Sequence, residues 1–113
     1  MTLDQLQLSS VEKTAIEEAG RTLKSGLPIG GVILFGSKTR GNACAQSDID
    51  LLILTSGPVA PELRRKVSES LARINLEYDV VLTAVIVSEK DWSEGLIHYT
   101  QLYQEVQRDG CLV

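Results

Sequence analysis

A chain of 113 residues with 43% hydrophobic residues is long enough to fill one hydrophobic core, so we expect a single domain that spans residues 1–113. The formal net charge of −4 and the aromatic content of 4% argue against a nucleic-acid binder that neutralises phosphates with a broad basic surface. The apolar stretches are too short to cross a bilayer, and the N-terminus has no basic segment that leads into an apolar one. We therefore expect a soluble cytoplasmic protein.

The first third of the chain predicts a helix followed by a strand. Ser9 and Glu12 form a capping-box signature, and the apolar residues after them recur at helical spacing. This helix is expected to end near Gly26. Residues 32–35 are a short run of β-favouring residues with turn signals on both sides, which predicts the first strand.

A polar segment then separates the first strand from the second. Residues 36–47 contain several turn-forming residues and indicate a functional loop, in which Ser37 is also suited to cap a short helical turn through Arg40. Residues 49–54 are apolar and end at a Ser-Gly-Pro turn, so they predict the second strand.

The second half of the chain predicts a helix, a strand and further helix. Pro61 fits the first turn of a helix that carries apolar residues on one face as far as Ile74. Residues 79–87 predict the third strand, and their nearly continuous apolar content indicates burial on both faces. A helical pattern follows from Ser88, and residues 111–113 predict a short terminal strand.

The pair Gly36-Ser37 suits the binding of a phosphate group where the first strand ends. Glycine has no Cβ to hold an anion away from the backbone, and the amides of such a turn lack partners within the strand. Ser37 adds a hydroxyl donor. Taken alone, however, such a pair is more often an ordinary turn than a phosphate site.

Asp48 and Asp50 are two residues apart at the start of the second strand. Because side chains alternate along a strand, both carboxylates are expected on the same side of it. Two oxygen ligands that leave the coordination incomplete suit Mg²⁺, which is usually completed by water and substrate phosphates. Alone, this pair could also be a charged strand edge that resists aggregation.

A third acid is expected from a neighbouring strand. Asp79 is the best candidate, because the unbroken apolar run begins directly after it. Glu77 is its rival, since it lies two positions earlier and would share a face with Asp79 if the strand began early. With two metal ions in the site, one would activate the acceptor hydroxyl while both stabilise charge on the α-phosphate.

These residues resemble the pattern of the polymerase-β-like nucleotidyltransferases, and within them the minimal nucleotidyltransferases that pair with HEPN proteins in prokaryotic toxin–antitoxin systems. That pattern is an apolar residue, Gly-Ser, about ten residues, Asp-x-Asp and a later single acid. Its places are filled here by Phe35, Gly36, Ser37, Asp48, Asp50 and Asp79. The chain departs from the pattern at Lys38 and Thr39, which are tolerant positions of the family.

The resemblance implies an α/β fold with a small mixed sheet and helices packed mainly on one face, which leaves the active site on the other. It implies that Gly36 and Ser37 hold the terminal phosphates of an NTP, that Arg40 supports the loop or the triphosphate, and that Asp48, Asp50 and Asp79 serve the Mg²⁺ ions. The acceptor it implies is a hydroxyl on a HEPN partner, with AMP from ATP as the transferred group.

Little of the sequence remains after the expected core to build an acceptor domain. We therefore expect the acceptor surface to come from another chain, either a partner protein or a second copy, and Trp92, Tyr99 and Tyr103 are candidates for the contact. The alternative function is a catalytically silent module that neutralises its partner by contact alone.

Overall fold

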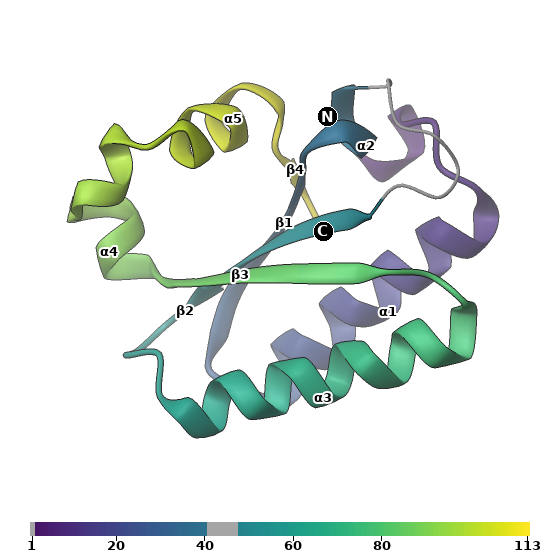
Figure 1. Ribbon diagram of the computed structural model, residues 1–113, viewed down its shortest axis with the longest axis horizontal. Helices are drawn as coiled ribbons and strands as arrows, with labels where there is room; N and C mark the ends of the chain where they lie inside the picture. Colours follow the sequence, from purple (N-terminus) through teal and green to yellow (C-terminus); the bar gives the residue numbers. More distant parts are fainter. Residues whose placement is uncertain (1, 41–47) are drawn as a thin grey trace.

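A computed structural model of the chain describes residues 2–40 and 48–113 (Figure 1). The structure contains the predicted capping box, the short terminal strand and the alternation of helices with strands. In chain order the elements are η1 (Leu3–Gln5), α1 (Ser10–Gly26), β1 (Ile29–Phe35), α2 (Ser37–Arg40), β2 (Ile49–Thr55), α3 (Pro61–Tyr78), β3 (Leu82–Ser88), α4 (Glu89–Glu94), η2 (Leu96–Tyr99), α5 (Gln101–Asp109) and β4 (Cys111–Leu112).

The strands form one mixed sheet in the order β3-β2-β1-β4. Strand β1 pairs with β2 and with β4 in antiparallel fashion, whereas β2 and β3 are parallel. The parallel pair needs a crossover connection, and helix α3 supplies it. Within the described residues, no helix has the length and apolar character that a membrane span requires.

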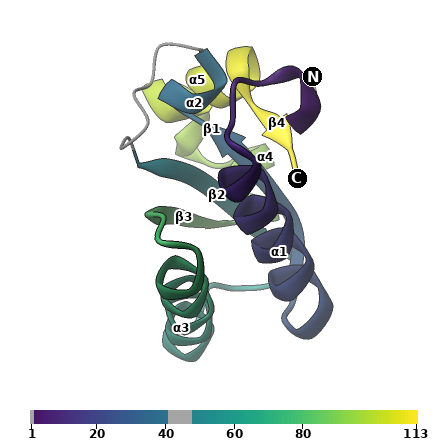
Figure 2. The same ribbon diagram turned by 90° about the vertical axis from the view of Figure 1, so that its right-hand side faces the viewer.

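The two long helices cover one face of the sheet, as expected. Residues Ile49, Leu51 and Ile53 of β2 pack there against α1 and α3 in the larger hydrophobic cluster. The opposite face is also covered in part, because a second cluster joins Leu52 of β2 to Trp92 of α4 and to residues of α5. Figures 1 and 2 show α1 and α3 on one side of the sheet and α4 and α5 on the other.

The third strand begins three residues later than predicted. Helix α3 runs to Tyr78, and Asp79 follows it as a left-handed C-cap with φ 54° and ψ 50°, a conformation that aspartate tolerates better than most residues. The Asn75 side chain then holds the start of β3, because it accepts a hydrogen bond from Leu82 N at 2.8 Å and donates one to Leu82 O at 3.2 Å. These contacts end the helix and fix the first residue of the strand.

The C-terminal aromatic residues are only partly available to a partner. Trp92 is buried, and its ring centroid lies 4.9 Å from that of Tyr103, which also stacks on His98 at 4.2 Å. Tyr99 is 84% exposed, and so is its neighbour Leu96 at 83%. Of the three aromatic residues predicted to contact a partner, Tyr99 is therefore the one fully presented to solvent.

Candidate nucleotide and metal site

The turn that leaves β1 is packed directly against Asp50. Gly36 has a φ of +87°, which L side chains rarely adopt, and a Cβ added there would lie 2.4 Å from Asp50 Oδ2. The sheet register explains this proximity, since Phe35 is the partner of Asp50 across the antiparallel pair of β1 and β2. Glycine is thus required at this position by both the backbone conformation and the adjacent carboxylate.

The residues after Gly36 form the short helix α2, as the Ser37 to Arg40 alternative predicted. Thr39 closes its first turn, because both its backbone N–H, at 3.1 Å, and its hydroxyl, at 2.7 Å, donate to Gly36 O. Ser37 is half-buried and Arg40 is exposed. Residues 41–47, the rest of the predicted loop, lie outside the described part of the chain.

The two aspartates lie at the start of β2. Asp50 is half-buried on the strand, while Asp48 immediately precedes the strand and is exposed. Ile49 between them is 1% exposed and belongs to the larger core, so alternation directs Asp50 to the opposite face, toward the α4 and α5 side. The fold therefore presents the Asp-Ile-Asp motif next to the Gly36 turn.

The residue of β3 that lies beside Asp50 is a threonine. In the parallel pair of β2 and β3, Asp50 is the register partner of Thr83, and the Thr83 hydroxyl donates a hydrogen bond of 2.9 Å to Asp50 Oδ1. Strand β3 contains no acidic residue. The structure does not bring Asp79 to this place, because Asp79 caps α3 three residues before the strand begins, and Glu77 lies within α3 itself.

The available donors fit a divalent cation that a substrate completes. Among the described residues, no three His, Cys, Asp or Glu side chains form a group that could hold a metal ion by themselves. The Asp50 carboxylate beside the glycine turn, with Asp48 two residues earlier, nevertheless matches the preference of Mg²⁺ for oxygen ligands and its usual reliance on water and phosphate oxygens. Asp48 and Asp50 are the residues that would hold it.

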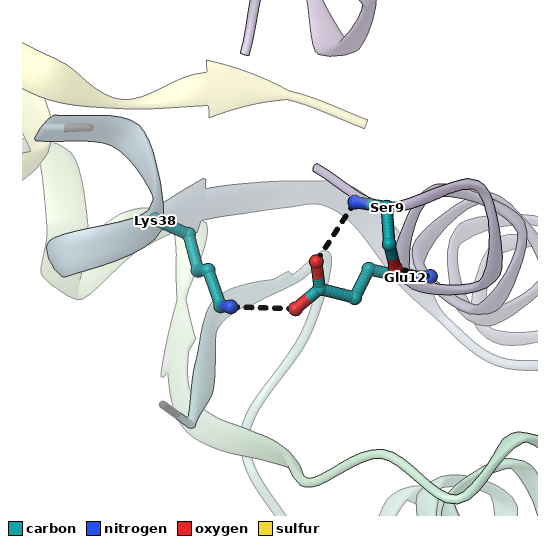
Figure 3. Close-up of polar contacts among 3 residues, drawn as sticks. All are labelled: Ser9, Glu12 and Lys38. Atoms are coloured by element: carbon teal, nitrogen blue, oxygen red, sulfur yellow. Dashed lines mark hydrogen bonds and ion pairs between the residues drawn. The ribbon is translucent and has the colours of Figure 1, made fainter. Parts of the chain in front are cut away.

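A buried ion pair fastens α2 to the start of α1 (Figure 3). Lys38 is only 4% exposed, and its Nζ lies 2.5 Å from Glu12 Oε2. The other oxygen, Glu12 Oε1, accepts a hydrogen bond of 2.9 Å from the Ser9 amide in the capping box of α1. Lys38 and Thr39, the two positions at which the chain departs from the family pattern, are both buried.

These contacts set the ionisation of Glu12. Burial acts to raise its pKa, but the hydrogen bond from Lys38, the Ser9 amide and the charge of Lys38 together outweigh burial and hold the pKa below its ordinary value of 4.5. The ionised form is therefore favoured in the folded protein. The resulting stabilisation is complete above the ordinary glutamate pKa and disappears as the pH falls through the lower, folded-state pKa.

The change Glu12→Gln is expected to lower the free energy of unfolding at neutral pH by about 1 kcal/mol, because glutamine keeps an acceptor for Ser9 but removes the charge that faces Lys38. Urea unfolding from pH 7 to pH 3 measures this difference, which should shrink below pH 4.5. The matched control is Glu69→Gln, since Glu69 pairs with Arg65 on the exposed surface of α3 and such pairs contribute little. A difference that persists at low pH would contradict the ionic explanation.

Sequence reasoning missed the roles of Lys38 and Thr83. The partners of both are distant in the chain: Glu12 is 26 residues from Lys38, and Asp50 is 33 residues from Thr83. Glu12 offered the one available signal. Its place in the capping box accounts for one carboxylate oxygen, and the other oxygen was free to accept from a distant donor such as Lys38.

Comparisons with known proteins identify the family of the chain. A family profile described as "Polymerase beta, Nucleotidyltransferase" matches residues 17–107. "Putative protein adenylyltransferase MJ0604" of Methanocaldococcus jannaschii is 38% identical over 81 residues, which cover 70% of this chain and 76% of that protein. "Putative protein adenylyltransferase MJ0141" of the same organism is 36% identical over 55 residues, and that match spans 49% of this chain and 56% of that protein.

Two solved structures share the fold. A chain from a crystal structure of a toxin–antitoxin with AMP-PNP superposes with a TM-score of 0.58 at 19% identity, over 88% of this chain and 70% of that chain. A chain from a tri-AMPylated Shewanella oneidensis HEPN toxin in complex with its MNT antitoxin gives a TM-score of 0.54 at 17% identity, over 88% of this chain and 69% of that chain. At these identities the likeness concerns the fold.

Proposed function

Since the chain belongs to the polymerase beta nucleotidyltransferase family, we propose that it is a Mg²⁺-dependent protein adenylyltransferase that moves AMP from ATP to a hydroxyl group of a partner protein. The observation that carries this proposal is the packing of the Gly36 turn against Asp50, two residues beyond Asp48. That packing places a backbone turn suited to phosphates next to carboxylates suited to a divalent cation.

Each residue of the site has a separate task in this proposal. Gly36 and Ser37 contact the terminal phosphates of ATP, and Arg40, which is exposed at the end of α2, supports the triphosphate. Asp48 and Asp50 hold Mg²⁺, which when bound supplies charge stabilisation at the α-phosphate and activates the acceptor hydroxyl. Asp79 is not proposed as a ligand, because Thr83 occupies the strand position beside Asp50.

The reaction is a displacement at the α-phosphorus. The acceptor oxygen forms a bond to this atom, the bond from the α-phosphorus to the bridging oxygen of the β-phosphate breaks, and pyrophosphate leaves. A site carboxylate near the acceptor takes the hydroxyl proton. The protein contributes mainly the alignment of the two oxygens and the electrostatic environment of the transferred group.

The proposed acceptor is a hydroxyl on a HEPN protein, and the chain acts as the antitoxin of that protein. The Shewanella oneidensis complex supports the proposal by its fold likeness, since its HEPN toxin carries AMP and is bound to an MNT antitoxin. The exposed apolar side chains of Leu96 and Tyr99 offer a contact surface for such a partner or for a second copy of the chain.

A second candidate is a module that neutralises its partner by contact alone. Thr83 favours this alternative, because the strand position beside Asp50 lacks the third acid that the family pattern contains. The two candidates differ in one measurable respect: only the enzyme leaves a covalent nucleotide on its partner.

The proposed activity is tested by incubating the purified chain with Mg²⁺, ATP labelled at the α-phosphate and a lysate of its source. We expect a labelled protein band that is absent with ATP labelled at the γ-phosphate, because AMP is transferred and pyrophosphate is released. Mass spectrometry of the band identifies the acceptor residue. A chain that labels nothing but still neutralises its partner would establish the contact-only alternative.

Nucleotide binding is expected to depend on the divalent cation. Asp48 and Asp50 offer too few ligands to hold Mg²⁺ alone, so ATP and Mg²⁺ should bind together and each should bind weakly without the other. Titration calorimetry with ATP in Mg²⁺ and in EDTA measures this dependence, and we expect at least about a tenfold difference in Kd, or roughly 1.4 kcal/mol. Equal affinities in the two conditions would refute the metal assignment.

A further inference from the structure

We infer that Thr83 is a positioning residue for Asp50. Its hydroxyl fixes one oxygen of the Asp50 carboxylate and leaves the other oxygen beside the Gly36 turn. This inference deepens the proposed function and rests on it for the role of Asp50. The centre then consists of two acids and a hydroxyl instead of three acids.

The geometry of the Asp50 carboxylate carries the inference. Oδ1 accepts a hydrogen bond of 2.9 Å from Thr83 Oγ1, while Oδ2 is the atom that a Cβ on Gly36 would approach to 2.4 Å. One oxygen is thus hydrogen-bonded from β3, and the other lies beside the turn that follows β1. A carboxylate restrained in this way keeps one side-chain rotamer before any ligand arrives, so less conformational freedom is lost when a cation binds.

The sheet register places Thr83, and no other residue of β3, directly beside Asp50. In the parallel pair of β2 and β3, Thr83 is opposite Asp50, and both side chains are half-buried. The hydroxyl has a weaker second acceptor, Ile49 O at 3.5 Å, so its shorter bond is the one to Asp50. The other members of β3 are apolar apart from Ser88, which caps α4 at the far end of the strand.

A hydroxyl at position 83 affects the charge of the site differently from an acid. A third carboxylate at this position would add charge for a second cation but would repel Asp50 in the free protein. A hydroxyl donates to Asp50 without repulsion and supplies no negative charge. The site should therefore bind nucleotide and Mg²⁺ with a preformed Asp50 and should hold a further cation only weakly.

The test compares Thr83→Val with Thr83→Ser. Valine keeps the β-branched shape and the strand preference but removes the donor, whereas serine keeps the donor. We expect Thr83→Val to weaken binding of Mg²⁺ with α,β-methylene ATP, a non-transferable analogue, by about fivefold in calorimetry and Thr83→Ser to bind within about twofold of the wild type. Equal weakening by both changes, or by neither, would overturn the role of the hydroxyl.

A second measurement needs no nucleotide. The NMR couplings between Hα and Hβ of Asp50 in the metal-free protein should indicate one rotamer in the wild type and in Thr83→Ser, and an average of rotamers in Thr83→Val. Unchanged couplings in Thr83→Val would overturn the inference whatever the binding data show. If the wild type binds no nucleotide, the proposed function fails, and the couplings still decide whether Thr83 positions Asp50.

Discussion

Asp50→Asn is expected to reduce AMP transfer at least about a hundredfold, which corresponds to roughly 2.7 kcal/mol of transition-state stabilisation. Asparagine keeps the shape of the side chain and its hydrogen bond from Thr83, but it removes one of the two negative charges offered to Mg²⁺. The measurement is the initial rate of transfer of labelled AMP to the partner at saturating ATP and Mg²⁺.

The fold should survive this change. The Thr83 hydroxyl at 2.9 Å can donate to the amide oxygen as it does to the carboxylate, and the substitution leaves the apolar neighbours of β2 untouched. The melting temperature of the metal-free protein is therefore expected to hold or to rise, because a charge next to Asp48 is removed. A loss of transfer accompanied by unfolding would not support the proposed role.

Asp79→Asn is the matched control. It makes the same chemical change at the acid that the sequence pattern nominated, and asparagine tolerates the left-handed conformation of this helix cap. We expect transfer within about twofold of the wild type, since Asp79 lies on the turn before β3. A loss as large as that of Asp50→Asn would show that Asp79 takes part in the reaction and that the site assembles differently with substrate.

A comparison of the wild type with Asp50→Asn also separates the enzyme from the contact-only module. Partner neutralisation is measured beside transfer for the wild type and Asp50→Asn. If neutralisation requires transfer, Asp50→Asn should lose both. Full neutralisation by a wild type with no detectable transfer would establish the module that acts by contact alone.

The elements with local signals could be predicted from the sequence. Ser9 and Glu12 do form the capping box of α1, Pro61 is in the first turn of α3, and the terminal residues 111 and 112 do pair with β1. The first two signals involve neighbouring residues, so they do not depend on tertiary packing. The α/β class and the mixed sheet followed from the motif and its resemblance, and the family match confirms them.

The start of β3 could not be predicted in the same way. Residues 80–87 are apolar except for one threonine, so the sequence contains no alternation that would fix where pairing begins. The boundary depends instead on the hydrogen bonds of Asn75 to Leu82, which close only when α3 and β3 are both in place. Because β3 was expected to begin at Asp79, this acid was predicted for the site, and Thr83 was not recognised as the residue beside Asp50.

The break in the C-terminal helical pattern has a similar cause. Apolar residues after Ser88 fit one helix, but the structure divides them into α4, η2 and α5. Gly95 ends α4 in an extended conformation, with its N–H bonded to Asp91 O at 2.8 Å, and Trp92 of α4 packs against Tyr103 of α5. This packing also covers part of the second face of the sheet, which the family resemblance implied would be open.

Gly36→Ala is expected to weaken binding of ATP with Mg²⁺ at least about tenfold, or roughly 1.4 kcal/mol, and to lower the free energy of unfolding by about 1–3 kcal/mol. The added Cβ would lie 2.4 Å from Asp50 Oδ2, and the φ of +87° is strained for alanine. Either Asp50 or the turn must move, so both the cation and the phosphates lose part of their site. Calorimetry and urea unfolding measure the two effects.

The matched control for this change is Gly57→Ala, in the turn after β2, where an added Cβ would meet no atom within 4 Å. Its backbone has no left-handed φ to strain, so we expect little change in stability or in ATP affinity. Because Gly36 contacts the Asp50 carboxylate itself, the double change Gly36→Ala with Asp50→Asn should weaken binding by less than the product of the two single effects. Independent effects in this double-mutant cycle would mean that the Gly36 turn and Asp50 act at separate places, and the proposed joint site for phosphate and cation would then be wrong.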